Sequence, residues 1–273
     1  EDSQIQRLLA ENTDLLIKVP PTQIDVIESA NNVRLEAYQS YKIEVIGFNF
    51  RNQHLKRKVI RQAITIATNR DRILKQWYAD RGEVLPGPFT RGSIYYNPDV
   101  EPLKYSVSEA RRMLSEAGYT VDNDQNIRVD RDGTPLSLRL LVKIESGGTN
   151  QTVQQVTQDF VEMMEEIGIR IIVDNRVIDE YEESRKTGDF DLILTSITFL
   201  PSYDISSLFM TNATMNFISY SNNYIDDLLN QFLRENEIDK RNELIYRVQT
   251  VLNDESPYLF LYSLENNAAV NNK

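Results

Sequence analysis

Residues 152–196 alternate helix and strand signals, and this alternation constrains the fold more than any other feature of the chain. Apolar residues recur at helical spacing over residues 152–167, and Gly168 stands where the helix must end. The following segments read as a strand at 169–173, a short polar helix at 178–186 and a buried strand at 189–196. This order predicts an α/β domain.

The remaining segments fit the same class. A strand is predicted at 41–50 after a polar stretch, one helix at 55–78, and an irregular loop at 82–102, which holds four of the nine prolines. The 106–117 helix has Ser106 as N-cap, Glu109 completing a capping box and Gly118 behind it. Further elements are expected as a hairpin of 126–129 with 136–142, helices at 223–234 and 239–252, and a closing strand at 258–262.

Charge and residue counts exclude several classes of protein. With 30 Lys and Arg against 41 Asp and Glu, the net charge is −11, which argues against nucleic acid and anionic lipid as partners. The chain has no cysteine, so thiol catalysis and cysteine-ligated metals are excluded. Because no apolar run approaches the ~18 residues of a membrane span, no transmembrane segment is predicted.

The common enzyme motifs are missing. The ten glycines form neither G-x-G-x-x-G nor a phosphate-binding loop, and G-x-S-x-G and H-E-x-x-H do not occur. The only histidine, His54, is expected at the surface or at a helix cap, and Trp77 is expected in the core. We predict no catalytic residue, no metal and no cofactor, although 41 acidic residues leave a carboxylate pair for glycoside hydrolysis open.

One segment has a partial calcium-loop pattern. Asp122, Asp124 and Asn126 alternate as loop ligands do. Ile127 and Gly133 stand where such a loop requires glycine and glutamate. A turn is therefore the favoured interpretation.

Two aromatic and polar loops are the best candidates for binding. Residues 195–203 follow a buried strand and read Thr-Ser-Ile-Thr-Phe-Leu-Pro-Ser-Tyr. Ligands dock at the carboxyl ends of strands in open α/β sheets. Residues 216–222 also interleave aromatic side chains with amides and hydroxyls. The alternative is that each loop is packed under its own aromatic side chains.

Short motifs spread along nearly the whole chain carry a family resemblance. They are Gly47-Phe48-Asn49-Phe50, Arg61-Gln62-Ala63-Ile64 with Asn69-Arg70, Pro86-Gly87-Pro88, Glu116-Ala117-Gly118-Tyr119, Ile167-Gly168-Ile169, Gly188-Asp189-Phe190-Asp191, and Tyr220-Ser221-Asn222 with Ile225-Asp226. In this order they resemble the C-terminal part of bacterial extracellular solute-binding proteins of the oligopeptide/dipeptide-binding family, family 5.

The resemblance implies a domain organisation. It predicts the C-terminal lobe of a two-lobed periplasmic-binding-protein fold of type II, with a mixed sheet flanked by helices. Residues 46–262 would form this lobe, residues 1–45 a remnant of the first lobe with a crossing segment, and 263–273 a return strand toward the first lobe. Because family members are much longer, we expect a truncated fragment whose parent carries a lipid anchor upstream.

The resemblance also implies a site. The expected ligand-binding residues are Ser196, Ile197, Thr198, Phe199, Asn216 and Tyr220, with Ile197 and Phe199 as apolar wall and the others as polar contacts. Ile197 stands where peptide-binding relatives usually have tryptophan. The acid that holds a peptide's amino terminus in those relatives falls near Leu200, with Asp204 displaced from it. Metal chelates, haem and oligosaccharides therefore stay open beside peptides.

The implied function is capture of a solute. The chain is expected to be the substrate-binding component of an ABC importer, acting outside the cytoplasmic membrane and docking on a membrane permease. Two lobes would close on a peptide or similar small solute by hinge motion. The alternatives are an extracytoplasmic carboxylate-dependent hydrolase, which requires a raised carboxyl pKa, and a non-transport sensor or chaperone with the same fold.

Overall fold

A computed structural model describes residues 2–20, 23–122, 124, 126–144, 150–198 and 204–272. Its main sheet has the strand order β1-β10-β3-β9-β7-β8, with β2 and β4 also paired to β10. These strands are β1 (Leu15–Leu16), β2 (Val33–Gln39), β3 (Lys42–Phe48), β4 (Gly82–Glu83), β7 (Ser137–Ile144), β8 (Arg170–Val177), β9 (Leu192–Thr198) and β10 (Tyr258–Asn271). A separate two-stranded sheet pairs β5 (Thr120–Asp122) with β6 (Ile127–Val129).

The sheet is mixed, as predicted for this fold class. β7 runs parallel to both β8 and β9, whereas β3 is antiparallel to β9 and to β10. Side chains therefore alternate between two apolar cores, one on each face. Ile46 and Phe48 of β3 enter the first core, and Ile43 and Val45 enter the second.

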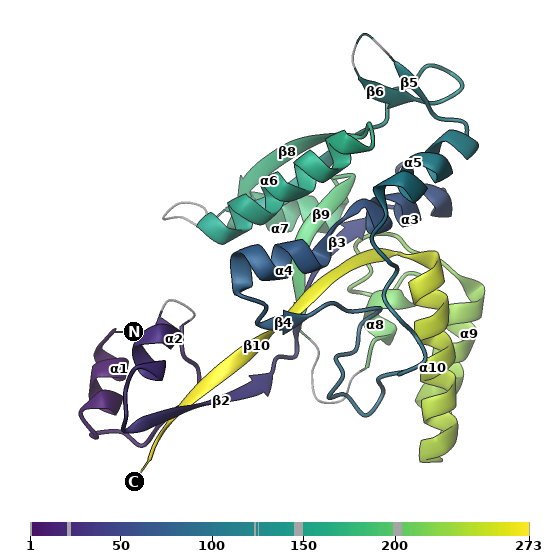
Figure 1. Cartoon of the computed structure of the whole chain (residues 1–273). Coiled ribbons are helices and arrows are strands. Elements are labelled where there is room, and N and C mark those ends of the chain that lie inside the picture. Colours follow the sequence, from purple (N-terminus) through teal and green to yellow (C-terminus); the bar gives the residue numbers. More distant parts are fainter. Residues whose placement is uncertain are drawn as a thin grey trace.

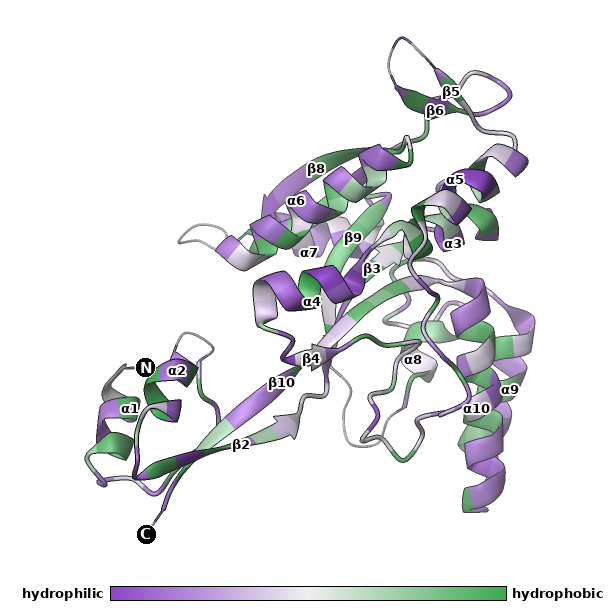
Figure 2. Cartoon of the chain, viewed as in Figure 1, coloured by the Kyte–Doolittle hydropathy of each residue, from purple (hydrophilic) through white to green (hydrophobic). Residues whose placement is uncertain are grey.

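Helices cover both faces of the sheet (Figure 1). The first core packs against α3 (Lys58–Ala67), α4 (Arg70–Tyr78), α5 (Val107–Glu116) and α6 (Gln151–Glu166). The second core packs against α7 (Ile178–Thr187), α8 (Ser206–Phe209), α9 (Asn223–Arg234) and α10 (Ile238–Glu255). Figure 2 shows the matching pattern, with β9 largely hydrophobic and α6 and α9 alternating hydrophobic and hydrophilic residues.

A smaller unit lies at the far end of β10 (Figure 1). It comprises α1 (Asp2–Leu9), α2 (Ile24–Glu28), β1 and β2. The third apolar core of the chain lies in this unit and contains Ile5, Leu8 and Ile27. β2 and β3 follow each other along the same strand, β10, which pairs with β3 through Tyr262 and with β2 from Glu265. A two-stranded ribbon therefore links the smaller unit to the α/β lobe.

Several expectations for local structure need correction. The helix predicted at 55–78 is two helices, because Thr68 is extended and the Asn69 side chain caps α4 by accepting from the Arg72 N–H. The predicted hairpin is wrong beyond its turn: a single bridge joins Val129 to Pro135, and β7 pairs with β8 and β9 instead. The polar stretch before residue 41 contains α2 and β2.

The 106–117 helix is confirmed, but only half of its capping box forms. The Ser106 hydroxyl accepts from the Glu109 N–H at 3.2 Å, while the Ser106 N–H donates to the Ile66 carbonyl. The Glu109 carboxylate instead binds Arg112 on the exposed face. Gly118 has the predicted left-handed conformation, with φ 89°.

Candidate functional site

The candidate site begins with three parallel strand ends. β7, β8 and β9 point the same way, so Ile144, Val177 and Thr198 mark one edge of the sheet. The antiparallel β3 begins at this edge with Lys42, which pairs with Thr198. The loop segments 145–149 and 199–203, which follow β7 and β9, lie outside the described residues. Sheet edges of this kind are where open α/β folds bind ligands.

Three of the predicted site residues are the last residues of β9. Ser196 and Thr198 are opposite Glu44 and Lys42 of β3, on the face of the first core. Thr198 is exposed and Ser196 is half-buried. Ile197 points to the other face, where it is buried in the second core. Strand alternation thus separates the hydroxyls from the apolar side chain.

A row of polar side chains crosses the sheet beside these hydroxyls. Tyr262 of β10, Glu44 of β3 and Ser196 of β9 are successive cross-strand partners. The Tyr262 hydroxyl is 2.9 Å from the Tyr78 hydroxyl, and the Lys42 Nζ is 2.7 Å from a Glu44 carboxylate oxygen. Sequence reasoning missed Glu44, although a carboxylate at an alternating position of an otherwise apolar strand was a visible signal.

Asn216 and Tyr220 lie in a loop of the second core. The Asn216 amide donates to the carbonyls of Met210 and Tyr220, and its oxygen accepts from the Tyr220 N–H. Tyr220 is 1% exposed, which raises the pKa of its phenol, and its ring meets Phe50 edge-on at 5.2 Å. The polar atoms of Asn216 are thus committed to the loop, and Phe199 lies outside the described residues.

The strand that carries the site is fixed by the Gly188–Asp191 motif. Gly188 ends α7 with φ 77°, a conformation that favours glycine. The Asp191 carboxylate accepts from the Asn52 side chain and from the Arg139 N–H, both at 2.8 Å. The Asn49 side chain donates to the carbonyls of Gly188 and Phe190. These bonds anchor the start of β9 to β3 and β7.

An ion-pair network lies beside this motif. Arg139 and Arg176 both contact Asp189 and Asp174, with Arg176 Nη2 at 2.9 Å from Asp174 and 3.2 Å from Asp189. The guanidinium of Arg139 is hydrogen-bonded to Asp189 and lowers the pKa of that carboxyl group. This network joins β7, β8 and the segment before β9 at the surface.

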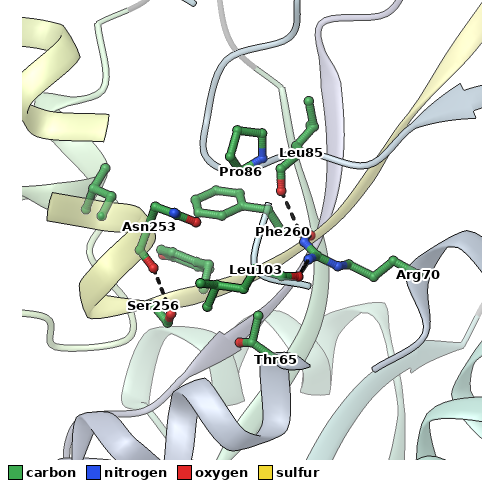
Figure 3. A pocket seen from close by; sticks show the side chains of 10 residues that line it. Thr65, Arg70, Leu85, Pro86, Leu103, Asn253, Ser256 and Phe260 are labelled. Atoms are coloured by element: carbon green, nitrogen blue, oxygen red, sulfur yellow. Dashed lines mark hydrogen bonds between the residues drawn. The ribbon is translucent and has the colours of Figure 1, made fainter. Parts of the chain in front are cut away.

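Two hollows of the described chain lie away from this end of the sheet. One, lined by Arg70, Pro86 and Phe260 among others (Figure 3), has a volume of about 10 Å³, which is room for a single water. The other, of about 230 Å³, lies where β2 and β4 flank β10, between Tyr38, Glu83 and Glu265. Neither of these two hollows is lined by Ser196 or Thr198.

The ribbon beside the second hollow has an irregular register. Pairing of β10 shifts between Phe260 and Tyr262, next to the gap between β2 and β3. At this gap the buried Ser263 hydroxyl donates to the Lys42 carbonyl at 3.1 Å, and the Ser40 hydroxyl accepts from the Lys42 N–H at 3.0 Å. Two serines therefore satisfy the backbone where the ladder is interrupted.

Other side chains considered for chemistry have structural partners. His54 is buried, unlike the surface position expected, and its Nδ1 is 2.7 Å from the Tyr119 hydroxyl. Burial lowers the pKa of His54. Trp77 packs against the first core as expected, and its indole N–H donates to Asp159 at 2.8 Å. Among the described residues, no group of three or more His, Asp or Glu can hold a metal.

The possible calcium segment forms a turn instead. The Asp124 N–H donates to the Asp122 side chain at 2.9 Å, as in an Asx turn. In the part of the chain that the structure describes, no helix combines the length and the apolar character needed to cross a membrane.

Known proteins with similar sequences include two that are named for binding a solute. The oligopeptide-binding protein AppA of Bacillus subtilis is 28% identical over 260 residues, covering 92% of this chain and 47% of AppA. The nickel-binding protein NikA of Staphylococcus aureus is 20% identical over 277 residues, covering 100% of this chain and 52% of NikA. The chain thus spans about half the length of these curated relatives.

Solved structures agree on the fold. AppA from Bacillus subtilis in complex with a nonapeptide matches with a TM-score of 0.82 at 24% identity, over 99% of this chain and 54% of that chain. The nickel ABC transporter structure from Bacillus halodurans matches with a TM-score of 0.84 at 20% identity, over 99% and 56%. Residues 1–217 match a family model described as bacterial extracellular solute-binding proteins, family 5 Middle. The chain therefore belongs to the bacterial extracellular solute-binding proteins of family 5.

Proposed function

We propose that this chain is part of the substrate-binding component of an ABC importer, which captures a peptide or a similar small solute outside the cytoplasmic membrane. The family match over residues 1–217 is the observation that carries the proposal. Relatives are named for binding oligopeptides, nickel and glutathione. A shared fold that serves such different solutes supports solute capture as the common function.

The open strand edge supports a ligand site that a second surface completes. β7, β8 and β9 are parallel, so their carboxyl ends lie together, and Val177 and Thr198 at the ends of β8 and β9 are exposed. Closure about the two-stranded ribbon would bring a facing surface onto the edge. In our proposal Ser196 and Thr198 make polar contacts with the solute, and Ile197 and Phe199 form apolar wall.

The two residues of the second loop have a different role in this proposal. The Asn216 side chain does not touch the solute itself in this proposal, because its amide already donates to the carbonyls of Met210 and Tyr220. It holds the loop that makes the contact. Tyr220 is buried in the second core, where its ring meets Phe50 just beyond the end of β3, so in this proposal it holds its own loop in place. The division of the chain into lobe segments 1–45, 46–262 and 263–273 belongs to the same proposal. In the structure β3 runs through the first of these boundaries and β10 through the second.

We further propose that the protein is not an enzyme and that it delivers its solute to a membrane permease. A hydrolase needs a carboxylic acid whose pKa is raised. Among the described carboxyl groups, those whose pKa departs from its usual value are Glu109, Asp189 and Glu235, and each pKa is lowered, chiefly by hydrogen bonds to arginine or to backbone N–H groups. Attachment of the complete protein to the membrane by a lipid is also a proposal, which labelling with a radioactive fatty acid tests.

Calorimetric titration of the complete protein tests the function. The probes are peptides of two to six residues and, separately, nickel with histidine. Binding of one class gives a heat signal in the titration and, in a separate thermal unfolding experiment, raises the melting temperature further as the ligand concentration increases above Kd. The double variant Ser196→Ala, Thr198→Val is expected to weaken binding at least tenfold, whereas Thr250→Val on the exposed face of α10 leaves it unchanged. Equal affinities in the three proteins would contradict the site, and no heat with any probe would contradict the solute classes.

A further inference from the structure

We propose that β8 pairs with β8 of a second copy of this chain, in an antiparallel dimer whose two-fold axis passes through Ile172. The surface concerned is the outer side of β8, the side turned away from β7. The inference goes beyond the proposed function, because this side lies along the strand rather than at the strand ends where the solute is expected.

β8 has backbone groups that its neighbour in the sheet does not use. Among the described residues it pairs with β7 alone, and Figure 1 shows it at the border of the sheet beside α6. The Arg170 N–H donates to the Leu136 carbonyl of β7, so Arg170 and every second residue after it bond inward. The N–H and C=O groups of Ile171, Val173 and Asn175 therefore point outward. Such a row of unpaired groups is a template for another strand.

The features that protect most outer strands from association are largely missing here. β8 reads Arg-Ile-Ile-Val-Asp-Asn-Arg-Val and contains neither proline nor lysine. Ile172 is 54% exposed, whereas the next residue toward the start of the strand, Ile171, is buried in the first core. A strand with an exposed isoleucine and an unpaired outer side favours pairing with another strand.

Charge complementarity identifies a second β8 as the partner. With the axis at Ile172, the two copies of this isoleucine are direct partners, and Arg170 of each copy is opposite Asp174 of the other. Arg170 is exposed and has no ion pair among the described residues. Asp174 already contacts Arg139 and Arg176 of its own chain. A carboxylate has about four acceptor sites, so Asp174 can also bind the second arginine.

Other two-fold registers of the same strand are less favourable. An axis at Val173 sets Arg170 against Arg176, and an axis at Asp174 sets this carboxylate against its own copy. Like charges directly opposite each other are destabilising in a sheet. An axis at Asn175 leaves Arg170 beyond the end of the partner strand. The charges of β8 therefore select the axis at Ile172.

The backbone agrees with this register. Ile171 of one copy is opposite Val173 of the other, and because both point outward, each such pair exchanges two hydrogen bonds. Ile172 then occupies a non-hydrogen-bonded position, where side chains across the pair are closest. The paired segment is short, so its buried area is smaller than that of a standard protein interface and the dimer should be weak.

Sedimentation velocity of the complete protein tests the register by exchanging charges. Wild type is expected to show a monomer–dimer equilibrium between micromolar and submillimolar concentrations. Arg170→Glu and Asp174→Arg should each weaken dimerisation by about tenfold or more, because two attractive pairs become repulsive ones. An equimolar mixture of the two variants should form a heterodimer of wild-type strength, since both pairs are attractive again. Lys75→Glu makes the same change of charge as Arg170→Glu on the exposed side of α4 and should dimerise as wild type does.

A wild type that stays monomeric, a dimer that Arg170→Glu leaves intact, or a mixture of folded variants that does not associate overturns the proposal. Cross-linking covers the case in which Asp174→Arg fails to fold. Ile172→Cys places two thiols on the axis, at a Cα distance that a disulfide spans, so mild oxidation should join the copies. Ile178→Cys is the exposed control beyond the end of β8, where the two copies would be about 40 Å apart at strand spacing. Cross-linking of Ile172→Cys that is no faster than that of Ile178→Cys also overturns the dimer.

Discussion

Arg70 offers a sharp test of what holds the α/β lobe together. It is the first residue of α4 and only 6% exposed, and its guanidinium donates to the carbonyls of Leu85, Leu103 and Phe260 at 3.2, 2.7 and 3.0 Å. These bonds tie α4 to β10 and to both ends of the proline-rich loop, as Figure 3 shows for Leu85 and Leu103. We predict that Arg70→Met destabilises the protein without touching the proposed ligand edge.

The expected loss of unfolding free energy follows from two opposing terms, the cost of burying the charge and the gain from its hydrogen bonds. Burial lowers the pKa of Arg70 from 12.5 to about 10, which at 1.36 kcal/mol per unit means a cost of roughly 3 kcal/mol for the buried charge. Three hydrogen bonds from a charged donor contribute roughly 1.5–3 kcal/mol each. Arg70→Met removes both terms and leaves three carbonyls without their donor, so the free energy of unfolding should fall by about 3 kcal/mol.

Urea denaturation at pH 7 measures this change, with Lys75→Met as the control. Lys75 is exposed on the same helix, so the control removes one positive charge without removing a buried contact and should stay within about 0.5 kcal/mol of wild type. Arg70→Lys should lose most of the stability too, because one ammonium cannot reproduce the planar set of donors. A difference below about 1 kcal/mol between Arg70→Met and Lys75→Met would refute the reasoning.

Three further predictions concern other anchoring residues. Because burial lowers the pKa of His54, its contribution to stability is complete above the unfolded pKa of 6.5 and is lost as the pH falls below that value. The unfolding free energies at pH 7.5 and pH 5.5 should therefore differ less in His54→Gln than in wild type. An unchanged difference would contradict this. Gly188→Ala should lower the free energy of unfolding by about 1–2 kcal/mol, because φ is 77° and the new Cβ meets the Arg51 side chain. Thermal denaturation measures this loss, with Gly87→Ala as the control, since a Cβ at Gly87 meets nothing within 4 Å. Asn216→Ala should cost about 2 kcal/mol through three lost hydrogen bonds; if stability is kept while affinity falls, Asn216 binds the solute directly.

Local signals explain which helices the sequence predicts well. The helix expected at 223–234 is observed as α9 with the same limits, because Asn222 caps it and four buried apolar residues share one face. The 152–167 helix is α6, offset by one residue at each end, and Gly168 follows with φ 79° as predicted. In both cases cap and stripe lie within one short segment, so no distant contact is needed to define the element.

Local signals do not determine which strands pair with each other, and the hairpin predicted for residues 126–129 and 136–142 is wrong. Residues 127–129 pair with β5, and the expected partner segment lies in the main sheet as β7, between β9 and β8. The closing strand expected at 258–262 and the return strand expected at 263–273 form one continuous strand, β10, which ends at Asn271 and pairs there with β1 and β2. Alternating apolar residues show that a segment is a strand without showing which other strand it meets.

The candidate site divides along the same line. By itself the sequence predicted a buried strand that ends at Ser196 with Ile197 and Thr198 in the loop behind it, and its motifs pointed to the solute-binding family; the structure extends this strand to Thr198. Only the tertiary structure set Glu44 and Tyr262 beside Ser196, since these residues are far apart in the chain and meet through strand register. It likewise decided that the Asn216 amide serves its own loop. Periodicity is a local property, whereas cross-strand neighbours depend on how the whole sheet is assembled.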